Sequence, residues 1–124
     1  MDAKELIRTV ARRSGLSRAE AADLTRATLA TLADRLSAGE ARHLALRVPE
    51  PLGESLGART GSAQKFGLDE FVRRVSAHTG LTVREATDGV RAVLATLREA
   101  LGDEQFDHVM AQLPGEVREL AELG

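Results

Sequence analysis

The sequence aligns with itself at an offset of 65 residues, without a gap. Residues 4–53 match residues 69–118, and 17 of these 50 pairs are identical. The match is clearest where "RATLATL" at 26–32 returns as "RAVLATL" at 91–97. An ungapped internal repeat of this length indicates a duplication, and two copies are too few for a solenoid. We therefore expect two similar units that pack together about a pseudo-two-fold axis.

Both units carry the same helix start and stop signals. At 15–17 and 80–82 the sequence reads Gly-Leu-Ser or Gly-Leu-Thr. The glycine suits the left-handed residue that ends a helix, and the Ser or Thr, with Glu20 or Glu85 three residues later, has the spacing of a capping box. The predicted helices span 3–14, 18–36, 40–48, 68–79, 83–101, 104–113 and 116–123, with a short extra helix at 51–56.

These signals predict an all-α fold in which each unit contributes three to four helices to one compact bundle. The first unit covers 1–56, a polar linker covers 57–65, and the second unit covers 66–124, as one integrated domain. The apolar stripe of the second long helix supports this assignment, because Val90, Leu94 and Leu97 recur at helical spacing.

Composition excludes several classes of protein. With 43% hydrophobic and 29% charged residues the chain is globular in composition, and with no Cys it has no disulfide, zinc-thiolate site or thiol nucleophile. The N-terminus has acidic residues early and no apolar run, so we expect neither a signal peptide nor a membrane span, and a cytoplasmic location.

The repeated heptad also carries small residues on the side opposite its leucines. A helix that is small or apolar on most of its circumference is usually buried on more than one side. These residues form the candidate interaction surface, either as a seam between the two units or against a second chain, and we favour the seam. A homodimer through Leu46, Leu52 and Leu56 is a further hypothesis. The surface comprises Ala27, Ala30, Thr31, Ala92, Ala95 and Thr96.

The duplicated unit resembles the bacterial family named domain of unknown function 2267. The resemblance rests on the Gly-Leu-Ser/Thr turn, on "RAVLATL" and on a closing "QLP" at 112–114, and it covers nearly the whole chain. The first unit departs from the pattern with "RVP" and with Ala41 in place of a larger residue. The resemblance implies an all-helical bacterial protein, in some cases joined to regulatory domains, with no established activity and therefore no catalytic residues to transfer.

The residues that could carry chemistry are few. Glu40 and His43 have the i,i+3 spacing of helical di-iron ligands. The second unit has Gln105 in place of the glutamate, and we expect His43 and His108 to face solvent. No Ser, His and acid arrangement suggests a triad, and no glycine-rich loop suits a phosphate. We therefore predict no catalytic residues, no metal and no cofactor.

A candidate basic patch lies on the first helix. It comprises Lys4, Arg8, Arg12 and Arg13, but the sequence pI is about 5.9 and the chain has no Trp or Tyr for base stacking. Nucleic acid is thus an unfavoured partner. The sequence predicts a non-catalytic protein-interaction or scaffold module whose partner is unknown. The alternatives are a DNA-associated regulatory protein and a small-molecule sensor with its pocket between the two units.

Overall fold

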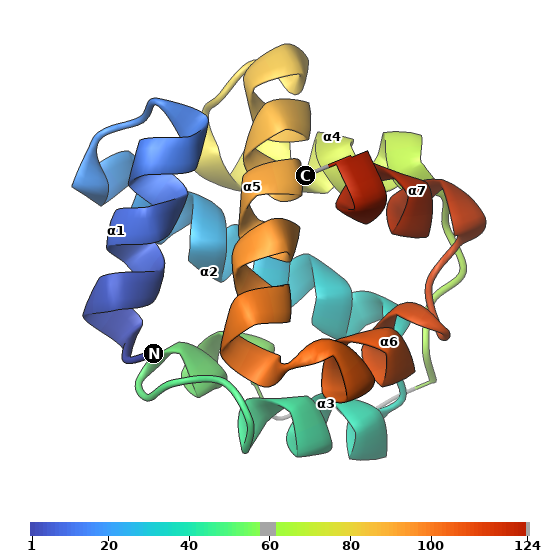
Figure 1. Cartoon of the computed structure of the whole chain (residues 1–124). Helices are drawn as coiled ribbons and strands as arrows, with labels where there is room; N and C mark the ends of the chain where they lie inside the picture. The colour runs from blue at the N-terminus through green and yellow to red at the C-terminus, as the bar shows by residue number, and fades with distance from the viewer. Residues whose placement is uncertain (58–61, 124) are drawn as a thin grey trace.

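The computed structural model describes residues 1–57 and 62–123, and within these ranges it is helical with no strand. This confirms the predicted all-α fold (Figure 1). The elements are α1 (Ala3–Ser14), α2 (Arg18–Arg35), α3 (Ala38–Ala45), the 3₁₀ helix η1 (Leu52–Leu56), α4 (Leu68–Thr79), α5 (Val83–Leu101), α6 (Asp103–Met110) and α7 (Gly115–Leu123).

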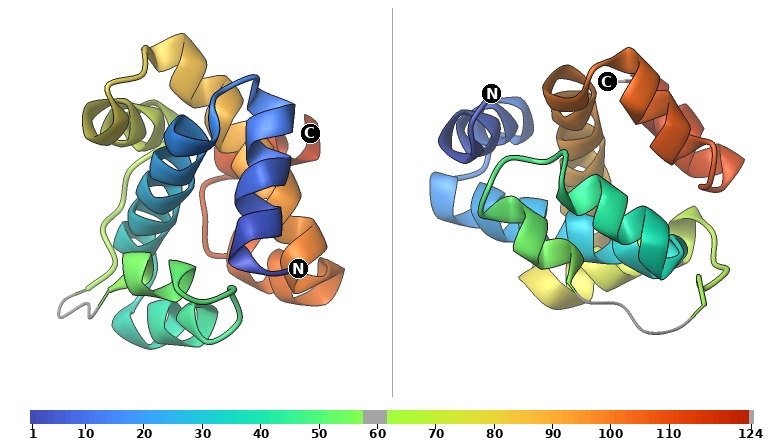
Figure 2. Two further views of the ribbon diagram at one scale, coloured as in Figure 1. Left: turned by 90° about the vertical axis from the view of Figure 1, so that its left-hand side faces the viewer. Right: turned by 90° about the horizontal axis from the view of Figure 1, so that it is seen from below.

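The two long helices, α2 and α5, contact each other at the centre of the molecule. Helix α1 packs against both of them, and so does α4, from the other side (Figures 1 and 2). The shorter elements are divided between the two, since α3 and η1 pack on α2, whereas α6 and α7 pack on α5. Each long helix therefore has neighbours around most of its circumference.

The helix bounds repeat at the offset of the sequence alignment. Helices α1 and α4 begin and end 65 residues apart, and so do α3 and α6. The duplication itself, the superposition of the two units and the domain boundaries stay predictions. Residues 58–61 of the predicted linker lie outside the described residues. Its later part is attached to α2, because the amide of Gln64 donates to the carbonyl of Asp34 at 2.8 Å.

The predicted caps are confirmed at the starts of α2 and α5. In each capping box the hydroxyl accepts from the glutamate amide at 3.1 Å, and the glutamate carboxylate accepts from the Ser17 or Thr82 amide at 3.1 or 2.8 Å. Hydrogen bonds from the amide and the hydroxyl of Ser17 to the Glu20 carboxylate lower the pKa of Glu20. Gly15 and Gly80 end the preceding helices with φ of 77° and 79°, in the left-handed region that favours glycine.

The bounds of the third helices differ from the prediction. Helices α3 and α6 begin one or two residues earlier than expected and end three residues earlier. Ser37 caps α3 by accepting from the Glu40 amide at 3.2 Å, a signal that the repeat obscured because Gly102 occupies the equivalent position. A tight turn, with the Val48 amide donating to Leu44, separates α3 from Pro49. The proline therefore follows the turn instead of ending the helix. Similarly, Pro51 precedes η1 and does not occupy its first position.

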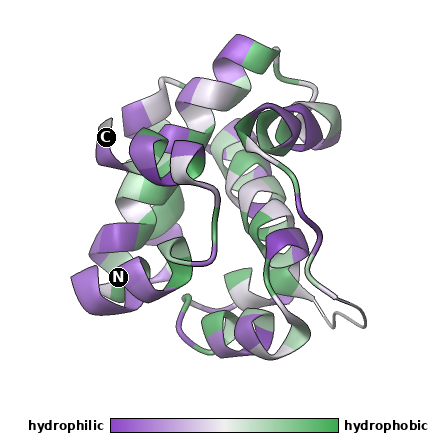
Figure 3. Cartoon of the chain, turned by 90° about the vertical axis from the view of Figure 1, so that its right-hand side faces the viewer, coloured by the Kyte–Doolittle hydropathy of each residue, from purple (hydrophilic) through white to green (hydrophobic). Residues whose placement is uncertain are grey.

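The predicted inward stripes are buried. Figure 3 shows the helices hydrophilic on their outer sides and hydrophobic where they face one another. In α2 the stripe includes threonines, and the hydroxyls of Thr25, Thr28 and Thr31 donate to carbonyls four residues earlier at 2.7–2.8 Å. Because these hydroxyls are satisfied within their own helix, they can be buried without the cost of an unpaired polar group.

Helices α2 and α5 approach closely at Leu24 and Gly89, which are both buried. A Cβ atom on Gly89 would lie 2.7 Å from both terminal methyl carbons of Leu24, closer than atoms pack. The two residues are also equivalent in the 65-residue alignment. Equivalent positions meet each other only near a two-fold axis. A side chain at position 89 would displace the methyl groups of Leu24.

Two arginines connect the units across the long helices. Arg74 of α4 donates to Asp34 of α2 at 3.1 Å and to Glu70 at 2.9 Å, and its guanidinium lies 3.9 Å from the centroid of the Phe66 ring. The hydrogen bond from Arg74 lowers the pKa of Glu70. On the other side of the molecule, Arg13 of α1 forms an ion pair with Glu99 of α5, which is the residue equivalent to Asp34.

Exchanging the two residues at the central contact tests the pseudo-symmetry. Gly89→Leu should lower the free energy of unfolding by about 1–3 kcal/mol through overpacking. Leu24→Gly should lower it by about 2–5 kcal/mol through the cavity that it leaves. The double variant Leu24→Gly/Gly89→Leu rebuilds the contact from the opposite side and should recover most of both losses in urea denaturation.

The matched control for this exchange is Leu29→Gly/Gly89→Leu, which removes a different buried leucine of α2. Because that pair does not rebuild the central contact, its losses should add. An exchange variant whose losses also add would show that positions 24 and 89 are not interchangeable, and the pseudo-two-fold packing would be wrong.

Candidate functional site

Helices α3 and α6 form one end of the molecule, where each leads away from the long helix that precedes it (Figure 1). A narrow groove lies between them and is lined from both units. Its cavity is about 10 Å³, room for about one water molecule. The lining residues are Glu40, His43, Leu44, Arg47, Leu101, Gln105, His108 and Val109.

The groove brings together the two histidines that the repeat shares. Both are exposed, as the sequence predicted, but they line the same groove. His108 Nε2 lies 3.5 Å from Glu40 Oε2, which joins α6 to α3. Sequence spacing paired Glu40 with His43 and missed His108 as its neighbour, because that contact depends on how the two units meet. Within residues 1–57 and 62–123, no three His, Cys, Asp or Glu side chains are grouped to hold a metal ion.

The residue directly after α3 has the most exposed large hydrophobic side chain among the described residues. Leu46 is 83% exposed. It lines a shallow hollow with Arg42 and His43, and a second hollow, lined by Glu50 and Glu54, meets the first at Ala45. We call this surface the Leu46 face and define it by Arg42, Ala45, Leu46, Glu50 and Glu54.

The Leu46 face corrects the dimer surface predicted from the sequence. Leu52 and Leu56 are 2% and 0% exposed, because η1 packs them against α2 and α3. They are part of the core and are not available to another chain. Of the three leucines proposed for a homodimer, Leu46 alone is exposed. The sequence could not separate them, since an apolar residue in or beside a short helix can be turned toward the core or toward solvent.

The small-residue surface of the long helices is largely covered within the chain. Four of its six residues are buried, namely Ala27, Thr31, Ala92 and Thr96, while Ala30 and Ala95 are partly exposed. Thr96 is covered by α1, because Arg13 Nη1 donates to its hydroxyl at 3.0 Å. This burial leaves little of the surface for a partner, and the seam between the two small-residue faces stays a prediction.

The candidate basic patch is divided by the fold. Lys4, Arg8 and Arg12 are exposed and form no ion pair among the described residues. Arg13 differs, since it reaches to Glu99 and Thr96 of α5. It stabilises the packing of α1, so it does not belong to a free basic surface.

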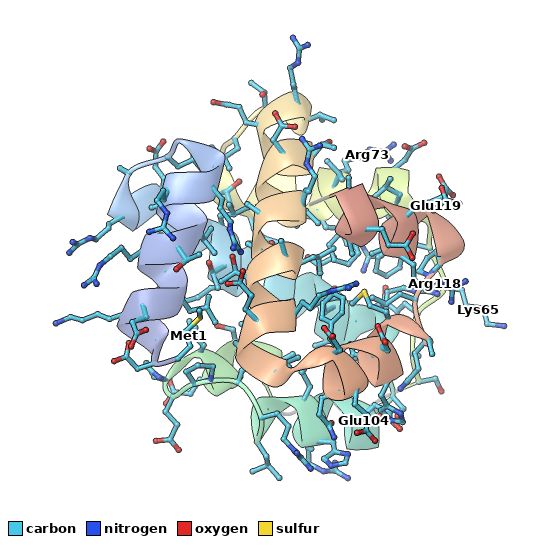
Figure 4. The ribbon with its side chains drawn as sticks, in the orientation of Figure 1. Met1, Lys65, Arg73, Glu104, Arg118 and Glu119 are labelled. Carbon is cyan, nitrogen blue, oxygen red and sulfur yellow. The ribbon has the colours of Figure 1, made fainter. Side chains whose placement is uncertain are left out.

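Charged side chains elsewhere are spread over the surface. Arg73 of α4 and the neighbouring Arg118 and Glu119 of α7 lie on the same side of the molecule (Figure 4). The long helices carry equivalent i,i+3 ion pairs, with Arg26–Asp23 at 3.4 Å and Arg91–Asp88 at 2.7 Å. Such exposed pairs contribute a few tenths of a kcal/mol, so we assign them no functional role. No helix of the described chain is long and apolar enough to cross a membrane.

A model of a known protein family matches nearly the whole chain. The model of a family described as an uncharacterised conserved protein, DUF2267, matches residues 3–120. No curated protein matches the chain. The match covers the elements from α1 into α7, and with them both the groove and the Leu46 face.

Introducing a charge on the small-residue surface distinguishes a seam within the chain from an interface between chains. Ala92→Glu places a carboxylate at a residue that is 6% exposed, where burial of an unpaired charge is costly. We expect a much lower melting temperature and an unchanged oligomeric state. The control, Ala77→Glu on the exposed side of α4, should melt like the wild type. A folded Ala92→Glu variant of unchanged melting temperature but smaller oligomeric state would place this surface between chains.

Proposed function

The chain belongs to the DUF2267 family of uncharacterised conserved proteins, and we propose that it is a non-catalytic helical module that binds a protein partner through the Leu46 face. The observation that carries this proposal is the composition of that face. An exposed leucine is common on protein surfaces and alone means little. Here it lines one of two hollows that meet at the neighbouring Ala45, with charged residues around them. A small apolar centre with a polar rim is the usual anatomy of a protein interface.

The shape of the α3–α6 groove supports protein recognition over small-molecule sensing. Pockets for small organic ligands have volumes of about 300–1,000 Å³. The groove between the two units, where the sequence placed a sensor pocket, has a cavity of about 10 Å³. The two hollows of the Leu46 face are larger, about 360 and 490 Å³, but they lie open on the surface, which suits contact with another protein.

Site-specific photo-cross-linking tests the proposal. A photoreactive amino acid replaces Leu46 in the protein, produced in the cells that naturally make it, and adducts are resolved by gel electrophoresis and mass spectrometry. A module that binds through this face should give discrete adducts from position 46. The same group at Val83, the 58% exposed first residue of α5, is the control and should give none, because α5 begins at the end of the molecule opposite α3 (Figure 1).

Discrete adducts at position 46 that disappear in the Arg42→Glu background would support the proposal, because rim charges steer and orient partners. Equal labelling from positions 46 and 83, or no adduct from position 46, would contradict it.

A DNA-associated role is the second candidate. Lys4, Arg8 and Arg12 support it, because their i,i+4 spacing puts them on one exposed side of α1. Against it, Glu5 lies beside them, also exposed, and the chain carries a net charge of −2. We expect weak, sequence-independent binding to a labelled duplex at low salt, which is lost as salt rises.

The variant Arg8→Ala/Arg12→Ala completes the DNA test, with Arg26→Ala on α2 as the matched loss of an exposed arginine. Tight wild-type binding that only the double variant abolishes would favour the DNA-associated role over protein interaction.

A further inference from the structure

The Leu46 face is built on a close contact between α3 and η1. A Cβ atom on Gly53 would lie 2.6 Å from the carbonyl oxygen of Ala45, so the two elements approach as near as a glycine allows. Leu52 and Leu56, which lie on either side of Gly53 in the sequence, are buried. The contact fixes the two hollows relative to each other, with Ala45 as the residue that they share.

The two hollows carry opposite charge. Arg42 lies at the hollow that contains Leu46, whereas Glu50 and Glu54 lie at the other. All three charged residues are exposed, and none forms an ion pair among the described residues. Their charges are therefore available to a partner. Two hollows of opposite charge that meet at Ala45 give a surface whose charges can complement those of a second copy.

We propose that the Leu46 face binds the same face of a second copy of this chain, as a two-fold dimer. This inference rests on the proposed function and names its partner. A two-fold interface places the same patch of both chains together, so that each contact occurs twice. With the axis near Ala45, the basic hollow of one copy lies opposite the acidic hollow of the other. Arg42 of each copy then approaches Glu54 of its partner, and Leu46 lies over the hollow that contains Pro51.

The dimer is weak because the face is small. Stable interfaces bury about 800 Å² on each partner, and the Leu46 face comprises parts of one short helix and one 3₁₀ helix. Association of this kind is governed by its apolar centre, while the rim charges contribute orientation and discrimination against other partners. We therefore expect a monomer–dimer equilibrium that depends on concentration.

Sedimentation velocity from about 10 µM to about 1 mM measures that equilibrium over the range of weak complexes. The wild type should shift from monomer toward dimer as concentration rises. Leu46→Glu should weaken the association by about tenfold or more, as loss of a central contact does. Val83→Glu, which places the same charge at the other end of the molecule, should associate like the wild type. Thermal melts of all variants should match, because every position is exposed.

Charge reversal tests the pairing of the two hollows. Arg42→Glu alone sets acid against acid at both copies of the contact, and Glu54→Arg alone sets base against base, so each variant should associate more weakly than the wild type. An equimolar mixture of the two variants has complementary pairs at both contacts and should regain association as a heterodimer. The double variant Arg42→Glu/Glu54→Arg should regain it as a homodimer.

A wild type that stays monomeric at about 1 mM, or a dimer that Leu46→Glu leaves intact, would overturn this inference. So would single charge variants whose association is not restored by mixing. These outcomes are distinct from failure of the proposed function. If position 46 cross-links to a different protein and the wild type is monomeric, the proposed function stands. The inference that a second copy is the partner is then refuted.

Discussion

The contact between α2 and α5 is the constraint on which the rest of the structure depends. Leu24 of α2 packs on Gly89 of α5, where a single added carbon would overlap its methyl groups. This approach brings the two long helices together, and α1 and α4 then each lie against both of them. Every other element packs on one member of this pair or on a neighbour of it. A leucine opposite a glycine fills the contact at a place where two leucines would collide.

The same contact explains the composition of the long helices. Because α2 and α5 are covered on several sides, most of their circumference holds small or apolar residues. The threonines of α2 can lie in the core since each hydroxyl donates to its own helix. The polar connections between units lie farther out, at Arg74 with Asp34 and at Arg13 with Glu99. They are partly exposed, so they orient the helices more than they stabilise them.

The packing leaves the Leu46 face, a small surface at the α3 end of the molecule, open to a partner. The second unit covers α5 with α6 and the longer α7, whereas the first covers α2 with α3 and the short η1. The position of Leu46 is equivalent to that of Ala111, and both are exposed. The apolar side chain is large in the first unit alone, where it lines a hollow with Arg42 next to the hollow of Glu50 and Glu54. The difference between the units, more than their likeness, therefore defines the Leu46 face.

The sequence by itself determined the elements, because their signals are local. Capping boxes, left-handed glycines and apolar periodicity predicted seven α-helices, and six of their starts lie within one residue of those observed. The exception is α3, whose cap at Ser37 has no counterpart in the repeat. The burial of the heptad leucines and the exposure of His43 and His108 also followed from helical spacing.

The tertiary structure alone decided which distant residues meet. The Leu24–Gly89 contact, the approach of His108 to Glu40 and the reach of Arg13 to Glu99 join residues of different units. None of these contacts has a signal in local spacing. The orientation of η1 was also beyond the sequence, since it buries Leu52 and Leu56 and leaves Leu46 outside. Such contacts depend on how whole helices cross, which is set by the sum of many side-chain volumes and not by any short motif.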